Sequence, residues 1–351
     1  MTNYILRRLM YMVAVLFTVA GITFLLMHAV PGGPFDSEKK LPPEIMANLE
    51  KRYHLDDPLY LQFLNYLKDV TLPRFRADKP SLALEDDYLI TFQVGQVWFQ
   101  WINFGPSYAS RSRTVNDLFR DQLPVSFQLG IMALFIAVSI GVPLGVLSAL
   151  KQNTLFDYIG MSVAIFGVSV PTIVLAPILV WVVGVSLKWL PPSGWGAKPP
   201  FVLGLFPSSL GWDYLKYAIM PSFVLGFGSS AVIARLTRAS LLQVIREDYI
   251  RTARAKGLSE RLVIVRHALI NALIPVVTVL GPMFAALVTG TFVTELVFSI
   301  PGLGKYFVTS ISNRDYPVIM GTILLYAMFL VFANLFVDII YGFLDPRIRY
   351  D

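Results

Sequence analysis

Six long apolar stretches are the feature of this sequence that most limits how it can fold. They cover residues 9–30, 124–150, 159–187, 217–236, 269–296 and 316–343. A helix needs about 20 predominantly apolar residues to cross a hydrocarbon core of roughly 30 Å, and every stretch meets that requirement. Hydrophobic residues make up 55% of the chain and charged residues 15%, unlike a typical soluble domain. The sequence therefore predicts an all-α polytopic membrane protein with six transmembrane helices.

The distribution of Lys and Arg predicts which ends of these helices face the cytoplasm. Basic residues flank one set of ends at Arg7, Arg8, Lys151, Arg347 and Arg349. The link 235–267 also holds far more Arg and Lys than acids. Because positive charge accumulates in cytoplasmic loops, these segments and both termini are expected there. This topology accounts for the net charge of +6 without nucleic acid, whose binding segments usually carry aromatic residues or a recognisable module.

The chain lacks sequence signatures of its own energy source. It has no cysteine and three scattered histidines, at positions 28, 54 and 267, which argues against disulfides and a zinc cluster. No phosphate-loop motif is present, since "PGLGKYF" has the wrong spacing. The first apolar stretch is expected to be retained, because "HAVPGG" offers no clear cleavage site. Any active transport would therefore draw its energy from another polypeptide.

Four regions follow from this topology. Residues 1–30 hold the N-terminal segment and first helix, 31–123 form a large extracytoplasmic region, 124–343 form the core, and 344–351 form a cytoplasmic tail. Within 31–123, residues 41–55 and 56–70 each predict a helix. Residues 72–105 fit either a short hairpin around Gly95 or an interfacial patch with Trp98 and Trp101 at headgroup level.

Acids and prolines are the unusual residues within the spans. Asp338 lies near the cytoplasmic end of the last span and is expected either to pair with an Arg there or to cap a contact within the bundle. Glu295 closes the fifth span, where a structural role is favoured over a functional one, although an ionisable group in a membrane helix is a functional candidate by default. Pro171 and the other prolines predict kinks.

Residues 246–258 predict a short cytoplasmic helix that ends at a glycine. Gly257 interrupts the helix, and Ser259 stands where it would cap the next one. Ala253 and Ala255 have small side chains, so the helix would be narrow enough to enter a groove of another protein. Arg251, Arg254 and Lys256 would reach acidic or carbonyl groups at the rim of such a groove.

This segment resembles the coupling helix of ATP-binding-cassette importer permeases, in which a Glu-Ala-Ala triplet precedes a Gly and a later Leu-Pro pair. Aligned on Gly257, the triplet becomes Arg251, Thr252 and Ala253, and the pair becomes Leu269 and Ile270. The missing Glu and Pro are typical of the peptide-importing branch. Further similarity lies in "YILRRLMYMVAVLFTV", "YIRTARAKGLSER", "TELVFSIPGLGKYFV" and "LDPRIRY". The pattern is most similar to the B-type subunit of oligopeptide importers, with residues 73–102 as an apparent insertion.

The resemblance implies a non-enzymatic permease in the bacterial cytoplasmic membrane. Its implied partners are a homologous second permease, two ATPase subunits that bind ATP and Mg, and an extracytoplasmic peptide-binding protein. The coupling residues carried over are Arg251, Thr252, Ala253, Arg254, Ala255, Lys256 and Gly257. Permeases for dipeptides, glutathione or nickel share these motifs and remain alternatives, and a secondary transporter is an alternative of another class.

Small polar residues within the spans are the candidates for lining a translocation path. They are Ser169, Ser222, Ser229, Thr289 and Thr291, together with Glu295. Such side chains would suit a smooth conduit that does not grip the side chains of a peptide. Small hydroxyl residues in membrane helices more often serve helix packing, so both interpretations stay open.

Overall fold

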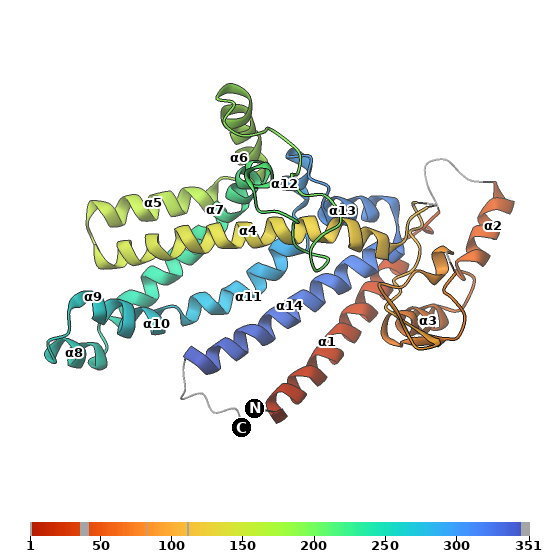
Figure 1. The fold of residues 1–351 in the computed structure, drawn as a ribbon, viewed down its shortest axis with the longest axis horizontal. Helices are drawn as coiled ribbons and strands as arrows, with labels where there is room; N and C mark the ends of the chain where they lie inside the picture. The colour runs from red at the N-terminus through yellow and green to blue at the C-terminus, as the bar shows by residue number, and fades with distance from the viewer. Residues whose placement is uncertain (1, 36–41, 82, 111, 345–351) are drawn as a thin grey trace.

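The computed structural model describes residues 2–35, 42–81, 83–110 and 112–344, and most of them belong to long helices (Figure 1). Within these residues, five helical segments are long and apolar enough to cross a membrane. They are α1 (Thr2–Ala29), α4 (Val115–Leu150), α7 (Trp212–Val244), α11 with α12 (Ile274–Val288 and Phe292–Val297), and α14 (Tyr316–Leu344). Five of the six predicted spans are thus confirmed as helical, and the remaining one differs.

The third predicted span is not one continuous helix. It consists of α5 (Leu155–Ser169), followed by α6 (Thr172–Leu179) and the π-helical segment η2 (Val180–Ser186), and the helix axis bends by 102° between the two arms. Proline offers no backbone N–H and disfavours helical geometry in the residue before it. Val170, just before Pro171, accordingly has extended backbone angles. The predicted span over 159–187 is therefore helical but sharply bent at Pro171, where the sequence predicts a kink, and the bent pair counts as one span at most.

Helices α4 and α7 pack with their backbones in direct contact. A Cβ atom added to Gly145 would lie 2.5 Å from the carbonyl oxygen of Ala234, and one added to Gly141 would lie 2.6 Å from that of Ser230. Gly226 on α7 meets α4 in the same way, with its Cβ position 2.5 Å from the carbonyl oxygen of Ala133. Small residues allow such close approach of membrane helices, so glycines at these positions hold the pair together.

The region between α1 and α4 combines short helices with a small sheet. The two predicted helices are confirmed as α2 (Pro43–Arg52) and α3 (Leu59–Thr71). Strands β1 (Arg74–Arg76), β2 (Ile90–Val94) and β3 (Val97–Trp101) pair antiparallel in the order β1-β3-β2, and a short 3-10 turn, η1 (Leu84–Asp86), precedes β2. Gly95 has φ +63 in the β2–β3 turn, which confirms the hairpin. The chain is mostly helical, as predicted, and this small sheet lies in the segment where the sequence allowed a hairpin.

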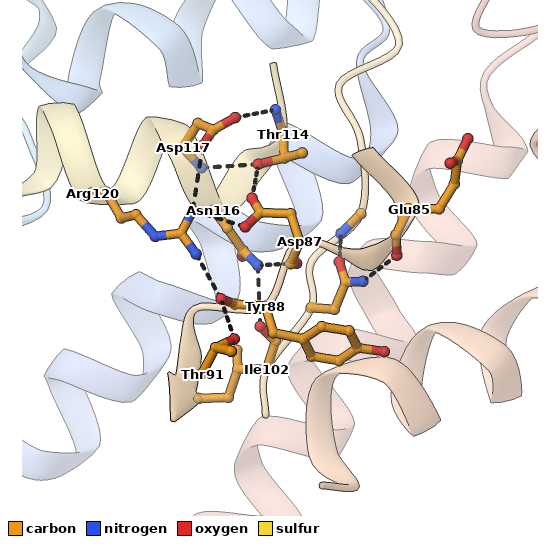
Figure 2. A network of polar contacts seen from close by, with 11 residues as sticks. Glu85, Asp87, Tyr88, Thr91, Ile102, Thr114, Asn116, Asp117 and Arg120 are labelled. Atoms are coloured by element: carbon orange, nitrogen blue, oxygen red, sulfur yellow. Dashed lines mark hydrogen bonds and ion pairs between the residues drawn. The ribbon is translucent and has the colours of Figure 1, made fainter. Parts of the chain in front are cut away.

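Polar contacts fasten this sheet region to the first turns of α4 (Figure 2). Thr114 and Asp117 form a reciprocal capping box at the start of the helix, and the Thr114 hydroxyl also donates to the Asp87 carboxylate. Asn116 donates to the carbonyl oxygens of Asp87 (2.7 Å) and Ile102 (3.1 Å). Arg120 pairs with Asp87 at 2.8 Å. Helix α4 therefore begins nine residues before the predicted apolar stretch, because its first turns bind polar loops instead of lipid.

The segments rich in Arg and Lys gather at one end of the helix bundle. Figure 1 shows the turn between α4 and α5, the start of α1, the end of α14 and helix α8 at that end, and α2 and α3 at the other. Arg8 on α1 pairs with Asp338 on α14 at 2.8 Å, which confirms the predicted pairing of Asp338 with an Arg. Arg347, Arg349 and the predicted tail from residue 345 onward lie outside the described residues.

Candidate functional site

The predicted coupling segment is a short helix followed by a glycine turn. Helix α7 ends at Val244, and three residues separate it from α8 (Asp248–Ala255). The chain then passes Gly257, with φ +76, where its amide donates to the Arg254 carbonyl oxygen at 2.9 Å. A left-handed residue of this kind commonly ends a helix, and glycine adopts it without steric cost. The structure confirms the predicted helix and its break.

Helix α8 is attached to the rest of the protein by one apolar edge. Ile250 and Ala253 are buried in a cluster with Leu241 of α7 and with Val263 and Ala268 of η3 (Val263–Ala268), the segment that leads into the membrane. Short helices α9 (Glu260–Leu262) and α10 (Leu269–Ala272) flank η3. Ala253, predicted as part of the coupling surface, thus faces inward. The other predicted coupling residues are exposed: Arg251, Thr252, Arg254, Ala255, Lys256 and Gly257.

A two-point ion pair closes the turn after α8. Arg254 Nε and Nη2 donate to the two carboxylate oxygens of Glu260 at 3.1 and 2.7 Å. The guanidinium lowers the pKa of the Glu260 carboxyl below its usual value. Ser259 occupies the position before α9, but its side chain makes no capping hydrogen bond, so the predicted cap is wrong in its chemistry. Arg254 and Glu260 hold the loop closed instead, with the modest strength of an exposed pair.

This geometry makes α8 a projection with a fixed base. Its buried edge joins the end of α7 to the segment that leads to α11, and Asn271 Nδ2 donates to the Tyr249 hydroxyl at 2.8 Å. Its exposed surface carries three basic residues, Arg251, Arg254 and Lys256, beside the small side chains of Thr252 and Ala255. A force applied to α8 would therefore act on two membrane helices at once.

The predicted path residues are spread over α5, α7 and the α11–α12 junction. Ser169 is exposed at the end of α5, and Ser229 is half-buried in α7. Ser222 is fully buried, and its hydroxyl has no hydrogen-bond partner among the described residues. The Thr289 hydroxyl bonds within its own helix, to the Ala285 carbonyl oxygen at 2.9 Å. Of this set, the structure brings only Thr291 and Glu295 into direct contact.

Glu295 lies at the centre of a buried polar cluster that links α4, α12 and α13 (Leu303–Asn313). Its carboxylate accepts hydrogen bonds from the Ser126 hydroxyl at 2.7 Å and from the amides of Thr291 and Lys305, each at 3.2 Å. Ser126 in turn accepts from the Leu303 amide at 2.8 Å. The carboxylate is thus engaged by its own chain, in keeping with the structural role favoured from the sequence. Ser126 was missed because nothing in its local sequence signals a partner so distant along the chain.

A second missed contact joins α5 to α7. Arg238 Nε and Nη2 donate to the Asp157 carboxylate at 2.7 and 2.6 Å, and the Asn153 amide donates to the same carboxylate at 3.0 Å. The Asp157 side chain is 4% exposed. Asp157 lies two residues before the predicted apolar stretch 159–187, and because an acid in a membrane helix usually has a partner, its position could have identified it.

Comparison with known proteins gives consistent matches over the whole chain. A family model for binding-protein-dependent transport system inner membrane components matches residues 141–350, and the model for the N-terminal part of such components matches residues 1–82. The dipeptide transport system permease protein of Bacillus subtilis is 42% identical over 349 residues, covering 99% of this chain and 98% of the relative. The oligopeptide transport system permease protein of Escherichia coli K12 is 39% identical, covering 100% of both chains.

Among solved structures, a chain of the MetNI methionine ABC transporter in inward-facing conformations shares the fold. It has a TM-score of 0.50 and 18% identity, and the match covers 64% of this chain and 94% of that one.

Proposed function

The chain belongs to the family of binding-protein-dependent transport system inner membrane components, and from that membership we propose that it is the B-type permease subunit of an ATP-driven peptide importer. Relatives that align over the full length are permease subunits of peptide transport systems. In the proposed complex, this chain forms half of the path. A homologous permease forms the other half, two ATPase subunits bind ATP and Mg beneath them, and a peptide-binding protein delivers substrate from the extracytoplasmic side.

The observation that carries this proposal is the projecting helix α8. Its exposed residues, Arg251, Thr252 and Arg254 to Gly257, would enter a groove of the ATPase, while its buried edge is fixed to α7 and η3 through Ile250 and Ala253. Closure of the ATPase dimer would push on α8 and shift the membrane helices between outward and inward access. Nucleotide thus biases an equilibrium between two states, which is how a ligand drives a conformational change. In this topology the end that carries α8 is cytoplasmic, as the positive-inside bias predicts.

Site-specific crosslinking of the assembled transporter tests this role. The chain has no cysteine, so a photo-crosslinker attached to Thr252→Cys reacts from one defined position. We expect a crosslinked adduct with an ATPase subunit. The yield of this adduct should fall when ATP binding changes the interface. Gln152→Cys, exposed in the α4–α5 turn at the same end of the bundle, is the control for mere proximity. Equal labelling of the ATPase from both positions, or none from Thr252→Cys, would contradict the coupling role.

Substrate class is tested separately by uptake. The dipeptide and oligopeptide relatives are similarly distant, at 42% and 39% identity, so similarity does not choose between them. Competition of radiolabelled tripeptide uptake by unlabelled peptides of two to six residues, by glutathione and by nickel separates these alternatives. We expect inhibition by the longer peptides. Loss of uptake on collapsing the ion gradient while ATP is held constant would instead favour a secondary transporter.

A further inference from the structure

Helix α3 lies beside the membrane-spanning part of α1. The Phe63 ring is centred 5.9 Å from that of Phe17 and 5.2 Å from that of Phe24, and a Cβ atom added to Gly21 would be 3.8 Å from Phe63 Cζ. At about 1.5 Å per residue, Gly21 lies about 12 Å from Ala29, the end of a candidate span that begins at Leu6. A hydrocarbon core of roughly 30 Å centred on this span of about 36 Å leaves Gly21 about 9 Å inside the acyl layer. A helix in contact with Gly21 therefore lies at membrane depth.

The sides of α3 have distinct surroundings. Phe63, Leu67 and Val70 pack on the core shared by α1 and α14. Gln62, Asn65 and Asp69 line a cavity of about 390 Å³ between α3 and the outer ends of α1 and α14. The remaining side is exposed and carries the apolar residues Tyr60, Leu61 and Leu64, with the exposed Lys68 one turn after Leu64. Over the same depth, α1 also exposes apolar residues, Ile22, Leu25 and Leu26. The exposed side of α3 thus continues a surface that faces lipid.

The sheet presents a second apolar surface. Successive side chains of a strand point to opposite faces, and the pairing aligns Phe75 with Phe99 and Phe99 with Phe92 in one row. Their ring centroids are 5.4 and 4.8 Å apart. The apolar face of the sheet comprises Phe75, Phe92, Val94, Val97, Phe99 and Trp101. Phe75 is 67% exposed and Val94 64% exposed, which is unusual for side chains surrounded by water on a folded domain.

The two surfaces adjoin. Trp101 Nε1 donates to the carbonyl oxygen of Thr71, the last residue of α3, at 3.0 Å, and the exposed Leu72 follows directly. On the side of α4, Arg120 and Asn116 hold the loops on either side of β2 and β3 in place (Figure 2). The sheet is therefore fixed to the same rigid framework as α3. The apolar face of the sheet therefore keeps a fixed orientation relative to α3, and both surfaces face the same surroundings.

We propose that the exposed side of α3 and the apolar face of the sheet are inserted together into the lipid leaflet at the Ala29 end of α1, as a monotopic element next to the transmembrane bundle. The leaflet is the outer one in the proposed topology. An amphipathic helix that lies in the interface buries its apolar side about 5–10 Å beyond the headgroups, which matches the depth of Gly21. Trp101 then lies near the headgroup level, where tryptophan is enriched. The occupant is lipid because the surface continues that of a membrane span.

Fluorescence quenching by lipids tests this inference. Single cysteines labelled with the fluorophore NBD are placed at Leu64→Cys and Phe92→Cys, in the complete transporter reconstituted in phosphatidylethanolamine and phosphatidylglycerol nanodiscs. The matched controls are the sequence neighbours Asn65→Cys and Gln93→Cys, which are also exposed but lie on the polar sides of α3 and β2. A lipid with a doxyl quencher high on its acyl chain should quench the labels at 64 and 92 at least about threefold more than the controls. Aqueous iodide should show the reverse order.

Two outcomes would overturn the proposal. Equal lipid quenching at each residue and its control would place α3 and the sheet above the membrane. Protection of the Phe92→Cys label from both quenchers, lost when the binding protein or the second permease is removed, would assign the face to a protein. The readout does not depend on transport, so it stands apart from any failure of the peptide-import proposal.

Discussion

Gly257 offers a substitution whose effect is confined to the backbone. The residue has φ +76, and a Cβ atom built on it would meet no other atom within 4 Å. A Cβ atom at this position therefore meets open space and displaces no neighbour. What it changes is the stability of the left-handed turn that sets the angle between α8 and α9.

The expected magnitude follows from that conformation. An L-residue in the left-handed region costs roughly 1–2 kcal/mol relative to glycine, which is a factor of about 5–30 in the population of the native turn. Asparagine enters this region several-fold more readily than most residues, whereas a β-branched residue is a genuine outlier there. The damage should therefore increase in the order Gly257→Asn, Gly257→Ala, Gly257→Val.

Proteoliposomes that contain the complete transporter provide the assay. Peptide uptake per ATP hydrolysed should stay near the native ratio in Gly257→Asn, fall several-fold in Gly257→Ala and fall furthest in Gly257→Val, with equal amounts of protein in the membrane. The Asp side chain of Gly257→Asp has nearly the same shape as the Asn side chain of Gly257→Asn. A loss of uptake only in the Asp variant would therefore show that negative charge at this position disturbs the proposed contact with the ATPase. Native coupling in Gly257→Val would refute the role of the turn, and equal losses in the Asn and Val variants would show that side-chain size matters instead.

Three further substitutions test contacts between the membrane helices. Ser126→Ala removes one hydrogen bond to Glu295 and one from Leu303, so it should lower the free energy of unfolding by about 1–3 kcal/mol; thermal unfolding in nanodiscs measures this, and a change under about 0.5 kcal/mol would contradict it. Asp157→Ala leaves Arg238 without its carboxylate and should cost about 3–5 kcal/mol, while the double variant with Arg238→Ala should be less damaged than the sum of the single variants; additive losses would show that the pair is uncoupled. Gly145→Ala should destabilise by about 1–3 kcal/mol through overpacking, whereas Gly228→Ala, whose Cβ would lie 3.4 Å from the Gly167 carbonyl oxygen, should be tolerated; equal stability of these two variants would argue against direct backbone contact at Gly145.

The sequence predicts the helices well because hydropathy and charge are local signals. Helix α14 matches its predicted apolar stretch within about a residue at each end, and the Gly257 break lies where glycine alone indicated it. The bend at Pro171 was anticipated as a kink, but not its size. A proline shows where hydrogen bonding is interrupted, whereas the packing of the two arms determines the angle between them.

The candidate site was harder to predict than the helices, because its contacts join residues that are far apart in the sequence. Glu295 stood out as an acid in an apolar stretch, yet its partners Ser126 and Lys305 come from other elements and carry no local signal. Ala253 was assigned to the outer surface of α8 because its small size suits a docking helix. The structure turns it inward, because only the packing of η3 against α8 decides which edge is covered.

The glycine contacts between α4 and α7 bear on how far a push at one end of the bundle can travel. Side chains in a packed interface can change rotamer and so absorb part of a displacement. Two backbones in direct contact cannot adjust in this way. Gly141, Gly145 and Gly226 bring the backbones of α4 and α7 into contact at several points along the two helices. The two helices are therefore expected to move together as one rigid unit. A displacement of α8, which is joined to the end of α7, would then move the opposite ends of α4 and α7, across the membrane, by nearly the same distance.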